Sequence, residues 1–534
     1  MSETYNIAAG FYRSVHEHGE RICYADSGSS RTYREMGTLA GRLATHLLKA
    51  GRPGRVGILG TRSMEAYAGI LGAALAGAAY VPINLKWPEE RIAALLRMLE
   101  LDALVVDEKG AALLTPAVLD AAPAEIVIAD AARRIEPRLA QTVTRLGALD
   151  CEALIEPVSV ASDDLAYIMF TSGTTGMPKG VMVSAGAVHS YLKQARKWTG
   201  FTPDDRIAET CDITFDLSVH DLFLCVEAGA SLHVLSALEM LAPARFIRSR
   251  EITAWLSVPT LAAMMQKGGA LKPGMFPSLR VSQFCGEPLP ASIAREWAAA
   301  TPNGVVENIY GPTEATVVVT RQRVTDPMVV TESRNIMALG AAFDTIDVAI
   351  FDTEQAVVAD GEPGEIAISG PQLAAGYLNA PEQTADRFRD VRGKRWYLTG
   401  DLGFRDRDGT LHHLGRIDNQ IKLKGNRIEL EEVEMHLRQA AQCDMVAVVA
   451  WPVIDGSAQG LVGFCVSSFQ PDVVTETLLK TLPRYMVPGS IQIVDTLPVN
   501  VNGKVDRRAL ADRLQEGVRK TIETQKPSFA ETIQ

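Results

Sequence analysis

The sequence has few cysteines, no basic block and no long apolar run. Its seven cysteines are scattered over 534 residues without any Cys-x-x-Cys spacing, which indicates reduced thiols rather than disulfides or zinc ligands. The longest apolar run, from about residue 68 to 83, consists largely of Ala and Gly and is interrupted by Pro82, so it is too short to span a membrane. The first residues show neither a basic start nor an apolar core. We therefore expect a cytoplasmic protein with no membrane partner.

The charge balance is acidic. The net charge is −11, and Lys and Arg form no block anywhere in the chain. Because nucleic-acid binding requires a basic patch or stripe, we expect no nucleic-acid partner. With 47% hydrophobic and 22% charged residues, the composition is that of a globular protein with a sizeable core.

The segment 171–180 has the densest set of small hydroxyls and glycines in the chain. It reads Thr-Ser-Gly-Thr-Thr-Gly-Met-Pro-Lys-Gly and joins two apolar runs, 167–170 and 181–183, that are typical of strands. Backbone amides, hydroxyls and one lysine on a glycine-rich loop form a cradle for a polyphosphate. The order Gly-x-x-x-x-Gly-Lys-Ser/Thr is absent, so this is not a Walker A loop. The alternative, a flexible polar turn, does not account for Lys179 between proline and glycine.

Helical patterns alternate with short strands in the first part of the chain. Helical periodicity at 32–48, 65–79 and 89–99 alternates with apolar runs at 55–59, 80–83 and 103–106, which predicts an α/β fold. We expect a large N-terminal domain of doubly wound sheets with a β-barrel-like part. Two later strands end at the polar segments 285–287 and 310–316, and open α/β sheets bind ligands at such carboxyl ends.

The character of the chain changes near residue 400. Tyr-Leu-Thr-Gly-Asp at 397–401 is followed by Gly-Arg-Ile-Asp at 415–418, and a helical pattern begins near 430. We predict a core of residues 1–416 and a small, mobile α+β domain of residues 417–534. That domain contains an Asn-Gly-Lys turn at 502–504 and ends in a polar stretch after Glu516 that we expect to be loose.

Together these motifs resemble those of the adenylate-forming superfamily, which comprises acyl-CoA synthetases, luciferases and nonribosomal peptide adenylation domains. The resemblance extends from the loop at 171–180 to the turn at 502–504. It implies ATP and Mg²⁺ as cofactors and a two-step reaction. A carboxylate attacks the α-phosphorus of ATP to give an acyl-adenylate and pyrophosphate, and a thiol then takes the acyl group. It also implies that the small domain rotates at a hinge, Asp418, between the two steps.

The resemblance also implies roles in the nucleotide site. Lys504 would be catalytic by stabilising charge on the transferring phosphoryl group, although in isolation it could be a surface lysine in a turn. Thr175 and Lys179 would act with it. Glu314 would bind Mg²⁺, a hard cation that prefers a carboxylate and phosphate oxygens.

The implied ATP-binding residues come from several separate motifs. Among them, Tyr310 would stack on adenine, Asp401 would accept both ribose hydroxyls and Arg416 would lie beside the ribose. The full set is Thr171, Ser172, Gly173, Thr174, Gly176, Gly286, Glu287, Tyr310, Gly311, Thr313, Asp401 and Arg416.

Asp216 precedes an apolar helical pattern that runs to Ala228. In isolation it could cap that helix. The matching aspartate of nonribosomal peptide adenylation domains holds the substrate's α-ammonium, so the resemblance implies a small amino acid as substrate. The implied substrate-binding residues are Asp216, Leu217, His220, Gln283, Cys285, Ile309, Val317 and Val318, together with Leu256.

Within the superfamily the motifs look most like those of D-alanine–carrier protein ligases, where a cysteine at the position of Cys285 narrows the pocket. His220 and Gln283 depart from that pattern because they are polar. His220 could hydrogen-bond the substrate with a charge that depends on local pH, or it could point to solvent. Polar lining suits serine, asparagine or diaminopropionate, whereas apolar lining suits alanine, valine or proline, so the amino acid stays open.

Too few residues follow Arg507 to form a carrier domain. We therefore expect a free-standing ligase that loads the phosphopantetheine thiol of a separate carrier protein in trans, in nonribosomal peptide or related natural-product biosynthesis. An acyl- or aryl-CoA synthetase is the alternative, and Asp216 argues against it. A regulatory pseudo-enzyme is a third possibility, which the presence of Lys179, Glu314, Asp401 and Lys504 argues against.

Overall fold

The computed structural model describes residues 5–139, 141–150, 154–173, 178–454, 457–466, 470–499 and 505–524. The chain forms two compact units. The first comprises Met1–Thr171 and Lys179–Asp418, and the second comprises Ser172–Pro178 and Asn419–Gln534. The structure thus divides the chain after Asp418, and it assigns a short piece of the predicted phosphate loop to the second unit.

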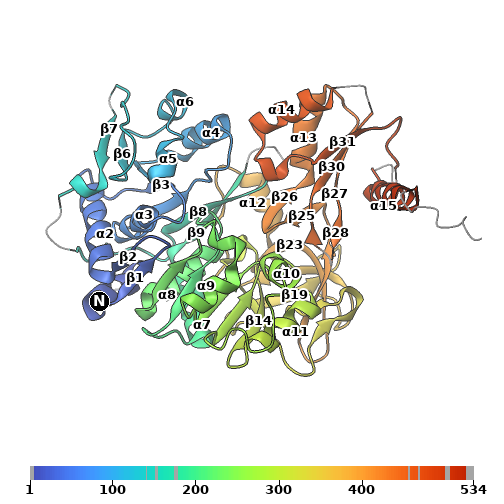
Figure 1. Ribbon diagram of the computed structural model, residues 1–534, viewed down its shortest axis with the longest axis horizontal. Helices are drawn as coiled ribbons and strands as arrows, with labels where there is room; N and C mark the ends of the chain where they lie inside the picture. Colours follow the sequence, from blue (N-terminus) through green and yellow to red (C-terminus); the bar gives the residue numbers. More distant parts are fainter. Residues whose placement is uncertain are drawn as a thin grey trace, which may run out of the picture. The chain divides into compact units, whose positions relative to one another are not determined.

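The first unit contains an eight-stranded sheet (Figure 1), and the predicted phosphate loop follows one of its strands, β8. Strands β8 and β9 pair antiparallel on either side of that loop, with Thr171 opposite Lys179. In order across the sheet the strands are β21 (Gly376–Tyr377), β9 (Lys179–Ser184), β8 (Leu165–Thr171), β4 (Ala79–Pro82), β3 (Arg55–Leu59), β5 (Ala103–Val106), β6 (Glu125–Ile128) and β7 (Thr142–Arg145).

The first unit also contains a nine-stranded sheet, and many of the remaining predicted site residues lie on its strands or in the segments that follow them. Its central strands run parallel from β14 to β1. In order across the sheet the strands are β18 (Ala341–Ala342), β15 (Thr320–Arg323), β14 (Val305–Tyr310), β13 (Val281–Phe284), β12 (Ala254–Ser257), β10 (Arg206–Glu209), β11 (Ser231–Val234), β1 (Ile22–Ala25) and β2 (Ser30–Thr32).

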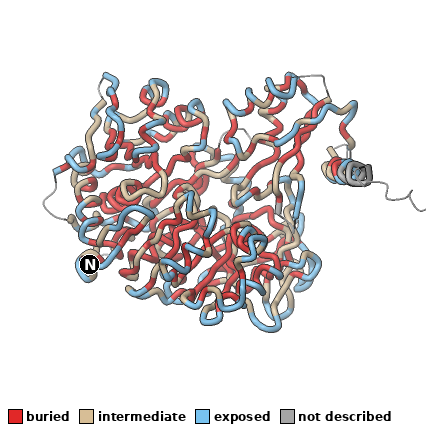
Figure 2. Tube along the Cα trace, viewed as in Figure 1, coloured by how far each residue is buried: buried red, intermediate tan, exposed pale blue. Residues whose placement is uncertain are grey.

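Helices pack on these two sheets, and local sequence accounts for where they begin. The hydroxyl of Thr32 accepts from the Glu35 amide while the Glu35 side chain accepts from the Thr32 amide, a capping box that starts α2. Figure 2 shows buried residues concentrated along the strands and along the inner faces of the helices. The helices of the first unit are α1 (Ala9–Glu17), α2 (Tyr33–Leu48), α3 (Met64–Leu75), α4 (Glu89–Leu99), α5 (Glu108–Ala111), α6 (Pro116–Leu119), α7 (Ala185–Thr199), α8 (Leu217–Ala228), α9 (Pro243–Ser249), α10 (Pro259–Lys267), α11 (Ala291–Ala300) and α12 (Pro381–Arg387).

The first unit also contains a five-stranded antiparallel sheet. Its longest strand places Asp401 directly opposite Arg416 of the neighbouring strand. The strands are β19 (Asp347–Phe351), β20 (Gly364–Ser369), β23 (Lys394–Arg405), β22 (Phe388–Val391) and β24 (Leu411–Arg416), and a separate two-stranded sheet contains β16 (Val330–Thr331) and β17 (Ile336–Met337).

The second unit is a small α+β body with its own core around Val433, Leu437 and Leu478. The helix α15 extends to Thr524, so part of the stretch that we expected to be loose after Glu516 is helical. The elements are β25 (Gln420–Leu423), β26 (Asn426–Glu429), α13 (Leu430–Ala441), β27 (Val446–Ala450), β28 (Val453–Ile454), β29 (Ser457–Ala458), β30 (Leu461–Cys465), α14 (Pro471–Thr481), β31 (Ser490–Ile493) and α15 (Arg507–Thr524).

The predicted α/β class, with large sheets and a smaller C-terminal region, is confirmed. Among the described residues, no helix is both long enough and apolar enough to cross a bilayer.

Candidate active site

The carboxyl ends of two neighbouring parallel strands define the position of the site. Strands β13 and β14 pair in parallel with Phe284 opposite Asn308, so the segments that follow them leave the sheet at the same edge. Gly286 takes a φ of +87° there, a conformation that favours glycine. Ligands of open α/β sheets bind at this edge.

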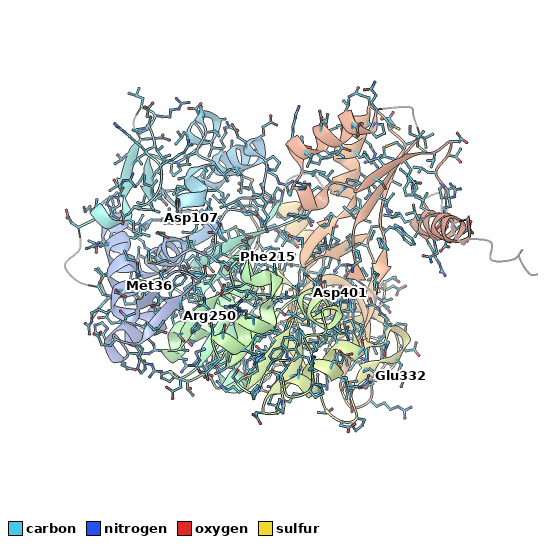
Figure 3. All side chains as sticks on the ribbon, in the orientation of Figure 1. Met36, Asp107, Phe215, Arg250, Glu332 and Asp401 are labelled. Atoms are coloured by element: carbon cyan, nitrogen blue, oxygen red, sulfur yellow. The ribbon has the colours of Figure 1, made fainter. Side chains whose placement is uncertain are left out.

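A buried carboxylate, Asp401, gathers hydrogen-bond donors at this edge. Tyr310, the last residue of β14, donates its hydroxyl to Oδ2 of Asp401 at 2.6 Å. Arg416 donates from Nη1 to Oδ1 at 2.9 Å. Burial raises the pKa of Tyr310, and the Asp401 charge raises it further, so the phenol stays protonated and can donate. Asp401, labelled in Figure 3, is thus held as an ionised acceptor beside the end of β14.

Arg416 also holds Asp418, the residue that we predicted to be a hinge. Its Nε donates to Oδ1 at 2.8 Å and its Nη2 to Oδ2 at 2.7 Å, a bidentate ion pair. Arg387 adds a second cation to Asp418 at 3.4 Å. One guanidinium therefore links the predicted ribose ligand to the predicted hinge.

A second group of side chains surrounds Glu314. The side chain of Glu314 is 1% exposed and accepts a hydrogen bond from the Tyr377 hydroxyl at 2.8 Å. The ammonium of Lys179 lies 5.7 Å from the centre of the Tyr377 ring. Tyr377, which the sequence did not suggest, therefore lies between the predicted metal ligand and a predicted catalytic lysine.

The Glu314 carboxylate is a hard oxygen ligand of the kind that Mg²⁺ prefers. The described residues contain no group of three or more His, Cys, Asp or Glu side chains that could hold a metal ion. A Mg²⁺ ion at Glu314 would then take its other ligands from phosphate oxygens and water, which is how this ion is usually bound.

The loop between these two groups adopts strained backbone conformations. Thr316 and Val317 have φ values of +56° and +67°, which are rare for β-branched residues. A methyl group on Gly311 would lie 2.5 Å from the Val317 carbonyl oxygen, so glycine is required there. Such strain persists only where the surroundings impose it.

Gln372 imposes this conformation from another part of the chain. Its side chain is fully buried. Its Nε2 donates to the carbonyls of Ala315, Thr316 and Val318 at 3.2, 3.3 and 2.9 Å. In return, the Thr316 hydroxyl donates to the main-chain carbonyl of Gln372 at 2.6 Å. Nothing in the local sequence pattern indicated this role.

The predicted substrate-binding residues lie within one buried region. Leu217, Leu256, Cys285, Ile309, Val317 and Val318 belong to the same hydrophobic core cluster. Gln283 is 1% exposed and donates to the Glu307 carboxylate at 3.1 Å. The predicted liners are therefore buried residues of the core of the first unit.

His220 is 1% exposed, so the alternative that it points to solvent is wrong. Its Nδ1 lies 2.5 Å from the Tyr191 hydroxyl, and Trp198 packs against the ring with a centroid distance of 5.9 Å. Burial lowers its pKa to about 3, although a hydrogen bond with Gln283 opposes the change. The imidazole is therefore neutral at physiological pH, and our expectation of a charge that depends on local pH is wrong.

Tyr191 joins several predicted liners, and sequence analysis missed it. It lies on the buried face of α7, where an aromatic residue is indistinguishable from ordinary core. Burial raises its pKa, and electrostatic interactions with Cys285, Asp221 and Asp216 add to the effect.

Asp216 occupies the N-cap position of α8, but its side chain makes no capping hydrogen bond. The capping alternative is therefore wrong. Burial raises the pKa of Tyr80 and Tyr167, and the charge of this half-buried carboxylate raises it further.

The remaining predicted residues are placed only in part. The amide of Gly173 donates to the Glu432 carboxylate at 3.2 Å within the second unit, so an anionic group already meets one amide of the predicted phosphate loop. The Glu287 carboxylate accepts hydrogen bonds from the amide and the hydroxyl of Thr260 at 3.0 and 2.5 Å. Ser172 is buried. Thr313 lies in a short 3₁₀ turn. Four predicted residues lie outside the described residues: Thr174, Thr175, Gly176 and Lys504.

Comparison with known proteins gives consistent relatives. A family described as "AMP-binding enzyme" matches residues 11–378. A D-alanine–D-alanyl carrier protein ligase from Lacticaseibacillus casei (strain BL23) is 32% identical over 522 residues, which cover 95% of this chain and 98% of that ligase. Gramicidin S synthase 2 from Brevibacillus brevis is 35% identical over 517 residues. The match covers 94% of this chain but only 11% of the length of that synthase.

A solved structure agrees over nearly the whole chain. The adenylation domain AlmE of Vibrio cholerae, in complex with glycyl-adenosine-5'-phosphate, superposes with a TM-score of 0.86 at 31% identity. The match covers 97% of this chain and 99% of that one.

The hydrogen bonds of Gln372 give a testable consequence. Replacing Gln372 with leucine keeps the volume but leaves buried carbonyls of the strained loop without their donor, which should lower the free energy of unfolding by about 2–3 kcal/mol. Urea denaturation of the purified protein measures this change. Gln322→Leu is the matched control, because that amide donates to the Arg323 carbonyl in an exposed setting, and it should change the value by less than about 0.5 kcal/mol. Equal stability of the Gln372 variant and wild type would contradict the role of Gln372.

Proposed function

Because the chain belongs to the AMP-binding enzyme family, we propose that it activates a small amino acid with ATP and transfers it to a carrier protein. In the first step the amino acid's carboxylate attacks the α-phosphorus of ATP, which forms an aminoacyl-adenylate and releases pyrophosphate. In the second step the phosphopantetheine thiol of the carrier takes the aminoacyl group and AMP leaves.

The observation that carries this proposal is the position of Asp216. Its carboxylate stands at the start of α8 without capping that helix, beside a predicted pocket whose other members are buried and mostly apolar. A carboxylate at the edge of an apolar pocket suits a substrate with an ammonium group, since ion pairs in poorly hydrated sites are strong and specific. We assign Asp216 to the α-ammonium of the substrate.

The nucleotide site follows from the other two groups of side chains. Asp401 would accept the ribose hydroxyls, with Tyr310 and Arg416 beside it, and Glu314 would hold Mg²⁺ on the phosphates. Lys179, Thr175 and Lys504 would be the catalytic residues, and Asp418 the hinge of a mobile C-terminal domain. These assignments rest on the motifs and on the contacts of Asp401 and Glu314 described above.

The burial of the predicted pocket supports a substrate with a very small side chain. Cys285, Ile309 and Val317 are each no more than 2% exposed, and His220 is 1% exposed. The L. casei relative is named for D-alanine, and the AlmE complex holds glycyl-adenosine-5'-phosphate. We therefore propose glycine or alanine as the substrate.

The carrier protein is the proposed partner, and cytoplasm the proposed compartment. The name of the L. casei relative includes a D-alanyl carrier protein. Another solved structure, 25% identical to this chain, contains both an adenylation domain and a carrier domain. Among the described residues, no disulfide joins the cysteines, which supports a reducing compartment.

Amino-acid-dependent exchange of pyrophosphate into ATP tests the first step. Glycine or alanine should drive exchange, and Asp216→Asn should lower kcat/KM for the amino acid about 100-fold or more, because it leaves the substrate ammonium without a counter-charge. Asp204→Asn, an exposed carboxylate paired with Arg21, is the control and should behave as wild type. Exchange driven only by acids without an amino group would instead favour an acyl- or aryl-CoA synthetase, and no exchange with any acid would favour a pseudo-enzyme.

Thiol transfer tests the second step. With radiolabelled glycine or alanine, a phosphopantetheinylated D-alanyl carrier protein should be loaded faster than coenzyme A at the same thiol concentration, since protein contacts add to those of the shared phosphopantetheine arm. The same carrier without its phosphopantetheine is the control and should stay unlabelled. Loading of coenzyme A as fast as any carrier tried would contradict the carrier as acceptor.

A further inference from the structure

A histidine and an arginine that no motif suggested stand behind Asp401. His413 lies on β24, and its Nε2 is 3.4 Å from Oδ1 of Asp401. Arg334, at the end of a short 3₁₀ turn of residues Glu332–Arg334, places its Nη1 2.5 Å from the Nδ1 of the same imidazole. The contacts run from Arg334 through His413 to Asp401, the predicted ribose ligand.

The chemistry of the guanidinium fixes the direction of these hydrogen bonds. An arginine side chain has only donors, so Nδ1 of His413 must accept from Arg334. The ring hydrogen is then on Nε2, which donates to the Asp401 carboxylate. Arg334 thereby selects the tautomer that lets His413 orient Asp401.

The surroundings indicate that this arrangement is specific. The side chains of His413 and Asp401 are 13% and 11% exposed, so their interaction is little screened by water. Burial lowers the pKa of Arg334, and the Asp401 charge opposes that change, which agrees with an arginine close to this carboxylate. Arg416 donates to the same Oδ1 and Tyr310 to Oδ2, so His413 completes a fixed set of donors.

The neighbouring histidine shows what an ordinary structural role looks like. His412 points to the opposite face of β24, as successive residues of a strand do. Its Nε2 lies 3.2 Å from Asp406, its Nδ1 lies 3.2 Å from the Thr331 hydroxyl, and its ring stacks on Phe404. It contacts a turn and the core, and serves as a matched control.

We infer that Arg334 and His413 are positioning residues for ATP, which fix the Asp401 carboxylate in the orientation that accepts the ribose hydroxyls. This inference rests on the proposed function, because it requires Asp401 to be the ribose ligand. A group that acts only through Asp401 should matter most for nucleotides that carry both hydroxyls and less for nucleotides that lack one. The phosphates and the adenine would be unaffected.

The experiment compares ATP with 2'-deoxy-ATP and 3'-deoxy-ATP in the pyrophosphate exchange reaction. For each variant, the ratio of KM for the deoxy nucleotide to KM for ATP measures how strongly the ribose hydroxyls are recognised. His413→Leu should raise KM for ATP about tenfold, the loss expected for a hydrogen bond to a charged group. It should leave kcat nearly unchanged and raise the KM of each deoxy nucleotide less than that of ATP, because one hydroxyl remains on Asp401, so the ratio falls.

Two further variants separate positioning from folding. His413→Gln can accept from Arg334 and donate to Asp401, so it should keep the wild-type ratio within about threefold. Arg334→Met removes the cation from a partly exposed site and should lower the ratio without loss of fold. If His413→Leu does not fold, Arg334→Met takes its place in the experiment. His412→Gln should leave the ratio unchanged.

The outcomes distinguish the inference from the proposed function. If Asp401→Asn keeps the wild-type ratio, Asp401 is not the ribose ligand and that part of the proposed function fails. If Asp401→Asn lowers the ratio but His413→Leu and Arg334→Met do not, the ribose assignment stands and the inference about the two positioning residues is overturned.

Discussion

The buried negative charge of Asp401 is the constraint on which the site depends. Its residue is 8% exposed, and a buried carboxylate is strongly destabilising unless it is paired and hydrogen-bonded. Tyr310 at the end of β14 and Arg416 on β24 supply that compensation, and so tie the parallel sheet to the antiparallel one. Because Arg416 also holds Asp418, where the first unit ends, the same ion pairs connect the proposed ribose ligand to the proposed hinge.

The second constraint is the strained turn after β14. Thr316 and Val317 adopt left-handed conformations, which bring Glu314 and the apolar liners Val317 and Val318 to one sheet edge. Gln372 satisfies the carbonyls of that turn, and Tyr377 fixes the Glu314 carboxylate. The segment 372–377 therefore supports both the proposed metal ligand and the proposed amino-acid pocket, although it contains none of the predicted site residues.

Sequence predicted what depends on local pattern. The strands at 55–59 and 103–106 and the helix at 89–99 appear with the predicted bounds, because burial periodicity is local. It did not predict the partners of Asp401 and Thr316. Arg334 and His413 are 79 residues apart in the chain, and Thr316 and Gln372 are 56 apart, so only the fold brings them together. His220 was misjudged for the same reason, since the rings that bury it come from other segments.

The central claim is that Asp216 and Asp401 together hold an aminoacyl-adenylate. Calorimetric titration with glycyl- and alanyl-sulfamoyl adenosine, stable analogues of that intermediate, tests it most directly when compared with the matching acyl analogues that lack the amino group. The account predicts that the amino analogues bind about 100-fold more tightly, and that Asp216→Asn removes this difference because the ammonium then has no charged partner. Equal affinity of the wild-type protein for analogues with and without the amino group would contradict the account.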